Sequence, residues 1–265
     1  MKYKTRKIPM TLEEYQALVF DPGWKQEYME GHLYLSPRHI RALGKVQIEK
    51  REVPSPHLLR EVMPEDREAL INLYLQAFAD TIHYFHLDSD DIRRHAQHDL
   101  DIFLSGQRGE PLLTASRVAL SQNRIIGAAL INEGHLKSPL LYLLFVAPEF
   151  QQQGLARAMV QAAMNTLRVN GYRYLRSQYD LGNHESRAWH EKMGFVAEPD
   201  WQVYRLLARE AESLVRFHER QADLSESEME TLRKKQADLQ AKAQALETMV
   251  NLFGYDAVDA QMGLK

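Results

Sequence analysis

The chain has 265 residues, of which 45% are hydrophobic and 26% charged, and its formal net charge is −3. This composition is typical of globular proteins, and the charge argues against a chain that coats nucleic acid, so we expect no nucleic-acid partner. Cysteine is absent, which excludes disulfides, thiol catalysis and cysteine-based zinc sites and fits a reducing cytoplasm. No apolar run reaches the roughly 20 residues of a spanning helix, and the basic start lacks a secretory h-region. We therefore expect a cytoplasmic protein without membrane segments.

Residues 1–56 predict a small extension made of a helix and a hairpin. Thr11 and Glu14 have the spacing of a capping box at the start of a short helix. The run "QEYMEGHLYLSP" predicts two short strands that turn about Gly31. Two prolines in "VPSPH" then indicate a linker.

Residues 57–207 predict an α/β (α+β) domain. A hairpin about the turn "SQN" and a continuously apolar strand "PLLYLLFV" indicate a mixed, mostly antiparallel sheet. Amphipathic helices before and after these strands would cover both of its faces. The predicted strands are 57–62, 112–120, 124–132, 139–146, 172–180, 195–199 and 201–207, and the predicted helices are 64–78, 89–105, 154–169 and 185–193.

Residues 208–265 predict a C-terminal helical extension. Ser225 and Glu228 form a second capping box. Apolar residues then recur every seventh position, which is typical of a coiled coil or helical hairpin. We expect either an intramolecular hairpin with the preceding segment or a homodimer contact. The two seam positions are Leu232, Leu239, Leu246 and Phe253, and Met229, Gln236, Ala243 and Val250, and Gly254 ends the pattern.

The junction "FVAPEFQQQGLARAM" carries the strongest functional signal. A strand ends at Pro148, and a helix opens at Gly154 after three glutamines. The first turn of a helix offers free N–H groups and a positive dipole end, to which a phosphate can bind. Gly154 leaves room for the phosphate, and the glutamines can add donors without a buried charge.

The spacing Q-x-x-G-x-A at this junction resembles motif A of the GNAT acetyltransferase superfamily. Downstream, "NHESRAWHEKMGF" (183–195) resembles the later signature of the same superfamily, in which an asparagine precedes a short helix and an E-K-x-G-F turn. The resemblance covers about residues 57–207 and implies a GNAT-type fold. It implies an N-acetyltransferase (acyltransferase) that passes an acetyl group from acetyl-CoA to a primary amine by direct attack in a ternary complex, without a metal.

The resemblance also implies which residues bind acetyl-CoA. Strand residues 144–146 would bind the pantetheine arm through their backbone, and residues 152–157 would hold the pyrophosphate. Asn183 would contact the cofactor from the other side of the cleft. The implied contacts are Leu144, Phe145, Val146, Gln151, Gln152, Gln153, Gly154, Leu155, Ala156, Arg157 and Asn183.

The sequence does not decide which residues act as general acid and general base in this transfer. His190 stands where the family commonly has a tyrosine that protonates the departing thiolate, and it would need a raised pKa, for example from Glu191. The alternatives are that His190 only packs and that Tyr179 or water donates. Gln178 replaces a glutamate that some members use as base, so the candidate bases are Glu133, His135 and an ordered water.

The acceptor amine would lie near the turn between the first two helices of the domain. His83, Tyr84, Phe85 and His86 are the candidate lining residues, and nearby aspartates would favour a cation. The alternative is a solvated loop with some buried aromatics. His83 and His86 are three residues apart, and so are His95 and His98. Neither pair is accompanied by further metal ligands, so we expect no metal. The acceptor class stays open between small molecules and protein N-termini or lysines.

Residues 10–39 also resemble the opening of a PD-(D/E)XK-type endonuclease family. The core that would carry its metal-binding acids is absent, so we expect a docking or dimerisation element and no nuclease activity. A rival to the enzyme is a non-catalytic acyl-CoA-binding sensor or scaffold that associates through its helical C-terminus.

Overall fold

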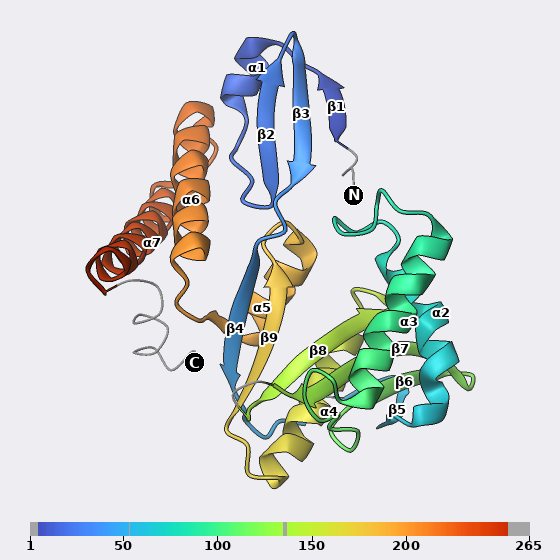
Figure 1. Ribbon diagram of the computed structural model, residues 1–265. Helices are drawn as coiled ribbons and strands as arrows, with labels where there is room; N and C mark the ends of the chain where they lie inside the picture. The colour runs from blue at the N-terminus through green and yellow to red at the C-terminus, as the bar shows by residue number, and fades with distance from the viewer. Residues whose placement is uncertain (1–4, 53, 135–136, 254–265) are drawn as a thin grey trace. The chain divides into compact units, whose positions relative to one another are not determined.

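The computed structural model describes residues 5–52, 54–134 and 137–253 (Figure 1). Its contacts divide the chain into two compact units. The second unit comprises residues 43–178 and 188–196, and the first combines residues 1–42, 179–187 and 197–265. The three-part division at residues 56 and 207 stays a prediction, and the contacts group the N-terminal segment with the C-terminal helices instead.

The larger sheet confirms the predicted fold class. Among the described residues its strand order is β10-β4-β9-β8-β7-β6-β5, with β5–β6, β6–β7 and β7–β8 antiparallel and β8–β9 parallel. β4 was not predicted. The strands are β4 (Arg41–Gln47), β5 (Leu58–Glu61), β6 (Arg117–Ser121), β7 (Arg124–Glu133), β8 (Pro139–Val146), β9 (Tyr174–Asp180) and β10 (Val196–Ala197).

Helices cover both faces of β6–β8 in the second unit (Figure 1). α2 (Arg67–Phe78) follows the short helix η1 (Pro64–Asp66) and packs beside α3 (Ser89–Ser105) on one face. Asp88 caps α3 by accepting from Asp91 N at 2.8 Å, and Gly106 ends it in the left-handed region at φ 71°. The helix predicted at 89–105 is thus confirmed, and a capping side chain and a left-handed glycine mark its two ends.

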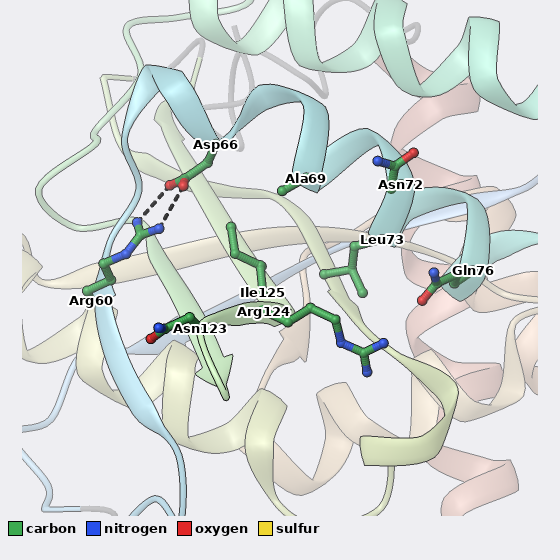
Figure 2. Close-up of a pocket in the computed structure, with 9 residues that line it drawn as sticks. All are labelled: Arg60, Asp66, Ala69, Asn72, Leu73, Gln76, Asn123, Arg124 and Ile125. Atoms are coloured by element: carbon green, nitrogen blue, oxygen red, sulfur yellow. Dashed lines mark hydrogen bonds and ion pairs between the residues drawn. The ribbon is translucent and has the colours of Figure 1, made fainter.

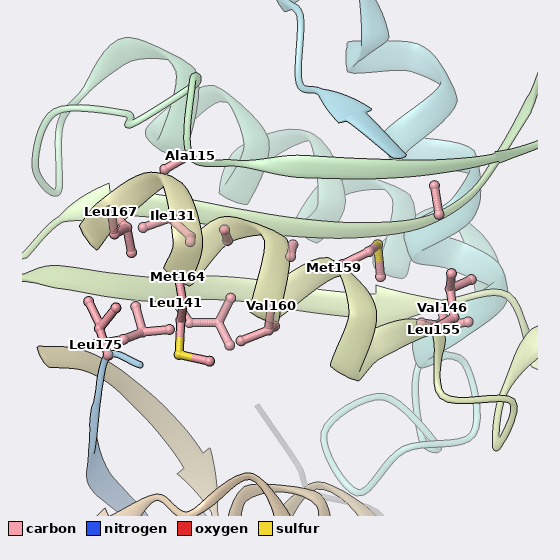
Figure 3. Packing of buried hydrophobic residues seen from close by; sticks show 14 of the residues in the cluster. Ala115, Ile131, Leu141, Val146, Leu155, Met159, Val160, Met164, Leu167 and Leu175 are labelled. Atoms are coloured by element: carbon pink, nitrogen blue, oxygen red, sulfur yellow. The ribbon is translucent and has the colours of Figure 1, made fainter. Parts of the chain in front are cut away.

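α4 (Leu155–Val169) covers the opposite face, with η2 (Pro148–Phe150) before it. Figure 3 shows its apolar stripe packed on the strands, and Met159, Val160 and Leu167 have no exposed surface. This is the stripe that the 3.6-residue period predicts. α5 (His184–Met193) follows β9.

The first unit contains a three-stranded antiparallel sheet in the order β1-β3-β2. The predicted hairpin about Gly31 is confirmed, with Glu30 and Gly31 both at positive φ (48° and 73°), as a tight primed turn requires. The capping box of Thr11 and Glu14 is also confirmed. The elements are β1 (Arg6–Pro9), α1 (Leu12–Ala17), β2 (Trp24–Met29) and β3 (His32–Pro37).

Two long helices, α6 (Trp201–Gln221) and α7 (Glu226–Phe253), complete the first unit. The predicted strand at 201–207 is wrong, because these residues are the first turns of α6. Asp200 caps α6 by accepting from Val203 N at 2.9 Å. In so short a segment, alternating apolar residues fit a strand as well as a helix.

α6 and α7 form the predicted helical hairpin (Figure 1). Glu219 near the end of α6 pairs with Arg233 near the start of α7 at 2.8 Å, so the helices run antiparallel. Leu239 and Leu246 of the predicted seam are buried against α6. The side chain of Phe253 and the predicted end at Gly254 lie outside the described residues.

The N-terminal segment packs against α6 within this unit. Phe20 N donates to Ser213 Oγ at 2.8 Å. The Phe20 ring lies under two guanidinium groups, that of Arg209 at 4.3 Å and that of Arg38 at 5.7 Å. Within the described part of the chain, no helix is both long enough and apolar enough to span a bilayer.

Candidate functional site

The junction between β8 and α4 has the backbone geometry of an anion cradle. Gly154 is the N-cap of α4 in the left-handed region at φ 79°, and a Cβ at this position would meet nothing within 4 Å. Gln152 is also left-handed at φ 59°. The first intrahelical bond runs from Ala158 N to Gly154 O at 3.0 Å. The N–H groups of residues 155–157 therefore precede the helix ladder and point out of its N-terminus.

The glutamines shape this loop. Gln151 Nε2 donates to Val146 O at 3.1 Å, and Gln153 Nε2 donates to Glu149 O at 2.9 Å. All three glutamines are exposed. The amides of Gln151 and Gln153 thus hold the loop to its own carbonyls, and each keeps a second N–H.

The rest of the first helical turn divides between core and solvent. Leu155 is buried under α4, Ala156 is half-buried and Arg157 is exposed. The side chain of Leu155 therefore anchors the helix. Its backbone N–H remains the part that can face an anion.

β8 pairs with β9 only near the N-terminal end of β8. The parallel register covers Leu140↔Arg176 and Leu141↔Ser177, whereas the antiparallel register with β7 continues to Val146. Ala147 N donates to Ile126 O of β7 at 2.9 Å. Because backbone groups alternate along a strand, the N–H and C=O of Val146 point to the opposite edge of β8. Leu144 and Val146 therefore present their backbone groups on the edge away from β7, whereas those of Phe145 face β7.

The side chains of these residues separate onto the two faces. Leu144 and Val146 belong to the cluster under α4, and Phe145 belongs to the cluster under α2 and α3. Phe145 lies 5.8 Å from the ring of Tyr74 and 5.7 Å from that of Phe78.

His190 is buried, with 4% of its surface exposed. Its Nε2 lies 2.8 Å from Ser177 Oγ, and its ring packs edge-on against Trp189 and Phe195. Ser177 is in the last pair of the β8–β9 register. The imidazole thus contacts the sheet where the two strands cease to pair, and the partner of Nε2 is a hydroxyl.

The other acid–base candidates have structural partners. Glu133, at the end of β7, accepts from the Tyr172 hydroxyl at 3.3 Å, and burial together with Glu133 raises the pKa of Tyr172. Asn183, which was predicted as a contact of acetyl-CoA and not as an acid or base, caps α5 by accepting from Ser186 N at 3.0 Å. Tyr179 packs in an apolar cluster of the first unit. His135 lies outside the described residues.

The predicted acceptor segment is half-buried from His83 to His86. The Tyr84 and Tyr74 hydroxyls lie 2.6 Å apart, and Tyr74 donates to Asp99 Oδ2 at 2.9 Å. Burial, followed by the neighbouring Tyr84 and Asp99, raises the pKa of Tyr74 far above its ordinary value. Tyr74 and Asp99 were not singled out from the sequence, because their spacing on α2 and α3 is that of ordinary helix residues.

A pocket of about 350 Å³ lies between α2 and the β6–β7 turn. Figure 2 shows Arg60 and Asp66 joined by two hydrogen bonds of 2.7 Å at one side and Arg124 at the other. Arg124 also pairs with Glu149 of η2 at 2.6 Å. None of the predicted acetyl-CoA contacts lines this pocket, so it is distinct from the cradle at Gly154.

Comparisons with known proteins concern the second unit above all. Residues 67–195 match the model of the acetyltransferase (GNAT) family. No match was found among curated proteins.

Several solved structures are similar to this chain. The PaiA N-acetyltransferase of Thermoplasma acidophilum in complex with coenzyme A is 16% identical over 55% of this chain and 93% of its own, with a TM-score of 0.44. The ribosomal-protein-S18-alanine N-acetyltransferase of Escherichia coli is 20% identical over 53% and 77%, with a TM-score of 0.40. A GNAT family acetyltransferase of Brucella melitensis in complex with acetyl-CoA is 16% identical over 53% and 87%, with a TM-score of 0.40.

Proposed function

We propose that this chain, whose residues 67–195 belong to the acetyltransferase (GNAT) family, transfers an acetyl group from acetyl-CoA to a primary amine. The amine nitrogen attacks the thioester carbon directly while both substrates are bound. The protein contributes by holding the two reactants in an attacking geometry.

The cradle at Gly154 is the observation that carries the proposal. Left-handed Gly154 opens the N-terminus of α4 without a side chain in the way. The pyrophosphate of acetyl-CoA would accept from the N–H groups of residues 155–157, and the helix dipole favours its charge. Gln152 and Arg157, both exposed, extend the cradle toward solvent.

The edge of β8 provides for the rest of the cofactor. The pantetheine arm carries two amides, which would pair with the backbone groups of Leu144 and Val146. The N–H of Val146 points to the same edge and would donate to the thioester oxygen as negative charge develops on it. Asn183 as a further cofactor contact is part of the same proposal.

The acetyl-CoA site can be tested with two glycines at opposite ends of α4. Gly154→Glu places a carboxylate in the cradle, and we expect calorimetry to show no acetyl-CoA binding. Gly171→Glu is the matched control, because Gly171 also has positive φ (88°) and open space around its Cβ position. The two variants share the backbone strain, and Gly171 differs in lying beyond the C-terminus of the helix. Equal affinity of wild type and Gly154→Glu would refute the cradle.

Transfer is tested by following free thiol from acetyl-CoA across a panel of small amines, polyamines and peptides with free N-termini or lysines. We expect release that depends on the amine and saturates in both substrates, with intersecting kinetics as a ternary complex requires. An acetylated amine identified by mass spectrometry would establish the acceptor class.

One observation favours the rival, a non-catalytic acyl-CoA-binding module. His190, at the position of the thiolate's proton donor, is buried and bonded to Ser177. Binding of acetyl-CoA with no acylation of any amine would establish the rival and reject the enzyme. The homodimer through α6 and α7 and the cytoplasmic location remain predictions.

A further inference from the structure

Three polar side chains form a continuous hydrogen-bonded chain on the α2–α3 face of the sheet. Tyr84 in the turn between these helices contacts Tyr74 of α2 at 2.6 Å, and Tyr74 contacts Asp99 of α3 at 2.9 Å. Tyr74 has 1% of its surface exposed, whereas Tyr84 and Asp99 are half-buried. The middle residue of this hydrogen-bonded series is thus buried, and the side chains at its two ends are partly exposed.

The direction of the hydrogen bonds follows from the donor inventory. A carboxylate only accepts, so the single hydroxyl proton of Tyr74 goes to Asp99. Tyr84 must then donate to Tyr74. A phenol oxygen has two lone pairs, so the Tyr84 hydroxyl can accept a hydrogen bond while it donates to Tyr74. The order is Tyr84 to Tyr74 to Asp99, with the negative charge at the far end.

The hydrogen-bonded residues Tyr84, Tyr74 and Asp99 lie next to Phe145, a residue of the proposed acetyl-CoA site. Phe145, on the β8 segment that would hold the pantetheine arm, packs its ring against Tyr74 at 5.8 Å. The ring of Phe78 lies beside both, 6.0 Å from the ring of Tyr84 and 5.7 Å from that of Phe145. The aromatic rings keep bulk water from the centre of the chain, and they place Tyr84 on the same face of β8 as Phe145.

We propose that Tyr84, Tyr74 and Asp99 form the proton relay that deprotonates the acceptor amine. This inference rests on the proposed N-acetyl transfer, and it assigns the base that Gln178 cannot supply. Tyr84 is the catalytic residue that contacts the nitrogen, and Tyr74 and Asp99 act through it.

The relay balances as three coupled proton transfers. As the nitrogen lone pair forms the C–N bond, the nitrogen becomes positively charged and its N–H more acidic. That proton passes to Tyr84 Oη while the Tyr84 proton passes to Tyr74 Oη and the Tyr74 proton passes to Asp99 Oδ2. The C–S bond then breaks, coenzyme A leaves as the thiolate, and Asp99 returns the proton to solvent through its exposed side.

The relay can be interrupted without emptying the core. Tyr74→Phe removes one oxygen from a ring that stays packed on Phe78 and Phe145, and Asp99→Asn keeps an acceptor oxygen that cannot take the proton. Tyr142→Phe is the control, because Tyr142 lies on the same face of β8, stacked on Phe103. Acetyl-CoA affinity by calorimetry and the thermal midpoint are measured for every variant.

The decisive readout is a pair of acceptors that differ in basicity. One is a primary amine that the wild type acetylates, and the other is its trifluoromethyl analogue. The nitrogen of the analogue is weakly basic, so after it attacks the thioester it can lose its proton directly to water. A positioned acid–base group contributes about 10²- to 10⁴-fold. We expect kcat for the basic amine to fall about 100-fold in Tyr74→Phe and Asp99→Asn, and kcat for the analogue to fall less than about 5-fold. Tyr142→Phe should change neither.

The outcomes separate this relay from the reaction it serves. If the relay variants lose the same factor with both amines, the hydroxyl chain only supports the structure and the relay is rejected. If they keep wild-type rates, the relay is rejected as well. If the wild type binds acetyl-CoA and acetylates no amine, the proposed function fails, and the relay falls with it.

Discussion

The two units of this chain differ in the contacts that stabilise each of them internally. The second unit has two large apolar clusters, one on each face of its sheet, and Met159, Leu167, Leu70 and Leu100 are almost or fully without exposed surface. Among its described residues the first unit has two small clusters, one with five buried side chains and one with four. Burial of apolar surface is the dominant favourable term in folding. Because its clusters are larger, the second unit has more of this stabilisation than the first.

Charged side chains supply several of the contacts within the first unit. Arg187 of α5 pairs with Glu210 of α6 at 2.9 Å, and both are more than four-fifths buried. Phe20 packs beneath Arg209 and Arg38, and His184 pairs with Asp21 at 2.8 Å. Contacts of this kind respond to pH and, where exposed, to salt, whereas apolar contacts do not. The comparison therefore predicts different sensitivities for the two units.

The largest effect is expected from a cavity in the second unit. Leu167→Ala removes a fully buried side chain from the inner face of α4, and the lost packing and the cavity should lower the free energy of unfolding by about 3 kcal/mol. Urea denaturation monitored by circular dichroism measures this loss. Val169→Ala on the same helix is the control, because Val169 is 85% exposed. A loss below about 1 kcal/mol would show that the cluster can close around the gap.

A smaller effect is expected from the buried ion pair of the first unit. Glu210→Ala leaves the Arg187 guanidinium buried without its carboxylate, and we expect a loss of about 2 kcal/mol, because an uncompensated buried charge is costly. The control is Glu212→Ala, whose pairing with Arg216 at 3.5 Å is exposed and should be worth less than about 1 kcal/mol. Equal losses for the two variants would remove the distinction between the buried and the exposed pair.

The predictability of the two units from sequence differs for a physical reason. In the second unit the elements carry their own signals, such as the stripe of α4, the apolar run of β8 and the glycine that ends α3 at Gly106. Helix caps and hydrophobic periods act over a few residues, so a single sequence reveals them. β4 was missed in the stretch between the hairpin and the linker, which offered no clear punctuation.

The first unit depends on contacts that sequence reading cannot see. The bond from Phe20 to Ser213 joins residues 193 positions apart, and no local pattern announces such a partner. The strand predicted at 201–207 was wrong because Val203 and Tyr204 suit a strand until α6 is seen to continue to Gln221. Tertiary packing decides such short segments, and propensity does not.

The candidate site shows the same division. The cradle at Gly154 follows from a local motif, and its left-handed backbone agrees with the need for glycine. The chain of Tyr84, Tyr74 and Asp99 joins two helices and a turn, so its members could not be linked before the fold was known. Tyr84 was named as a lining residue, and its partners were not.

The smallest effect is expected from replacing His184, and the pH dependence of this effect distinguishes the first unit from the second. The hydrogen bond to Asp21 raises the pKa of His184 above its ordinary value, an effect that burial partly opposes. The folded state therefore binds the proton more tightly, so the pair stabilises the protein fully below about pH 6.5 and less as the pH rises through the folded-state pKa. Since the His184 side chain is 53% exposed, we expect less than about 1 kcal/mol. The free-energy difference between wild type and His184→Asn should shrink from pH 5.5 to pH 8.5 in urea titrations. The same comparison with Leu167→Ala should stay constant, and a growing difference for His184→Asn would contradict the pairing with Asp21.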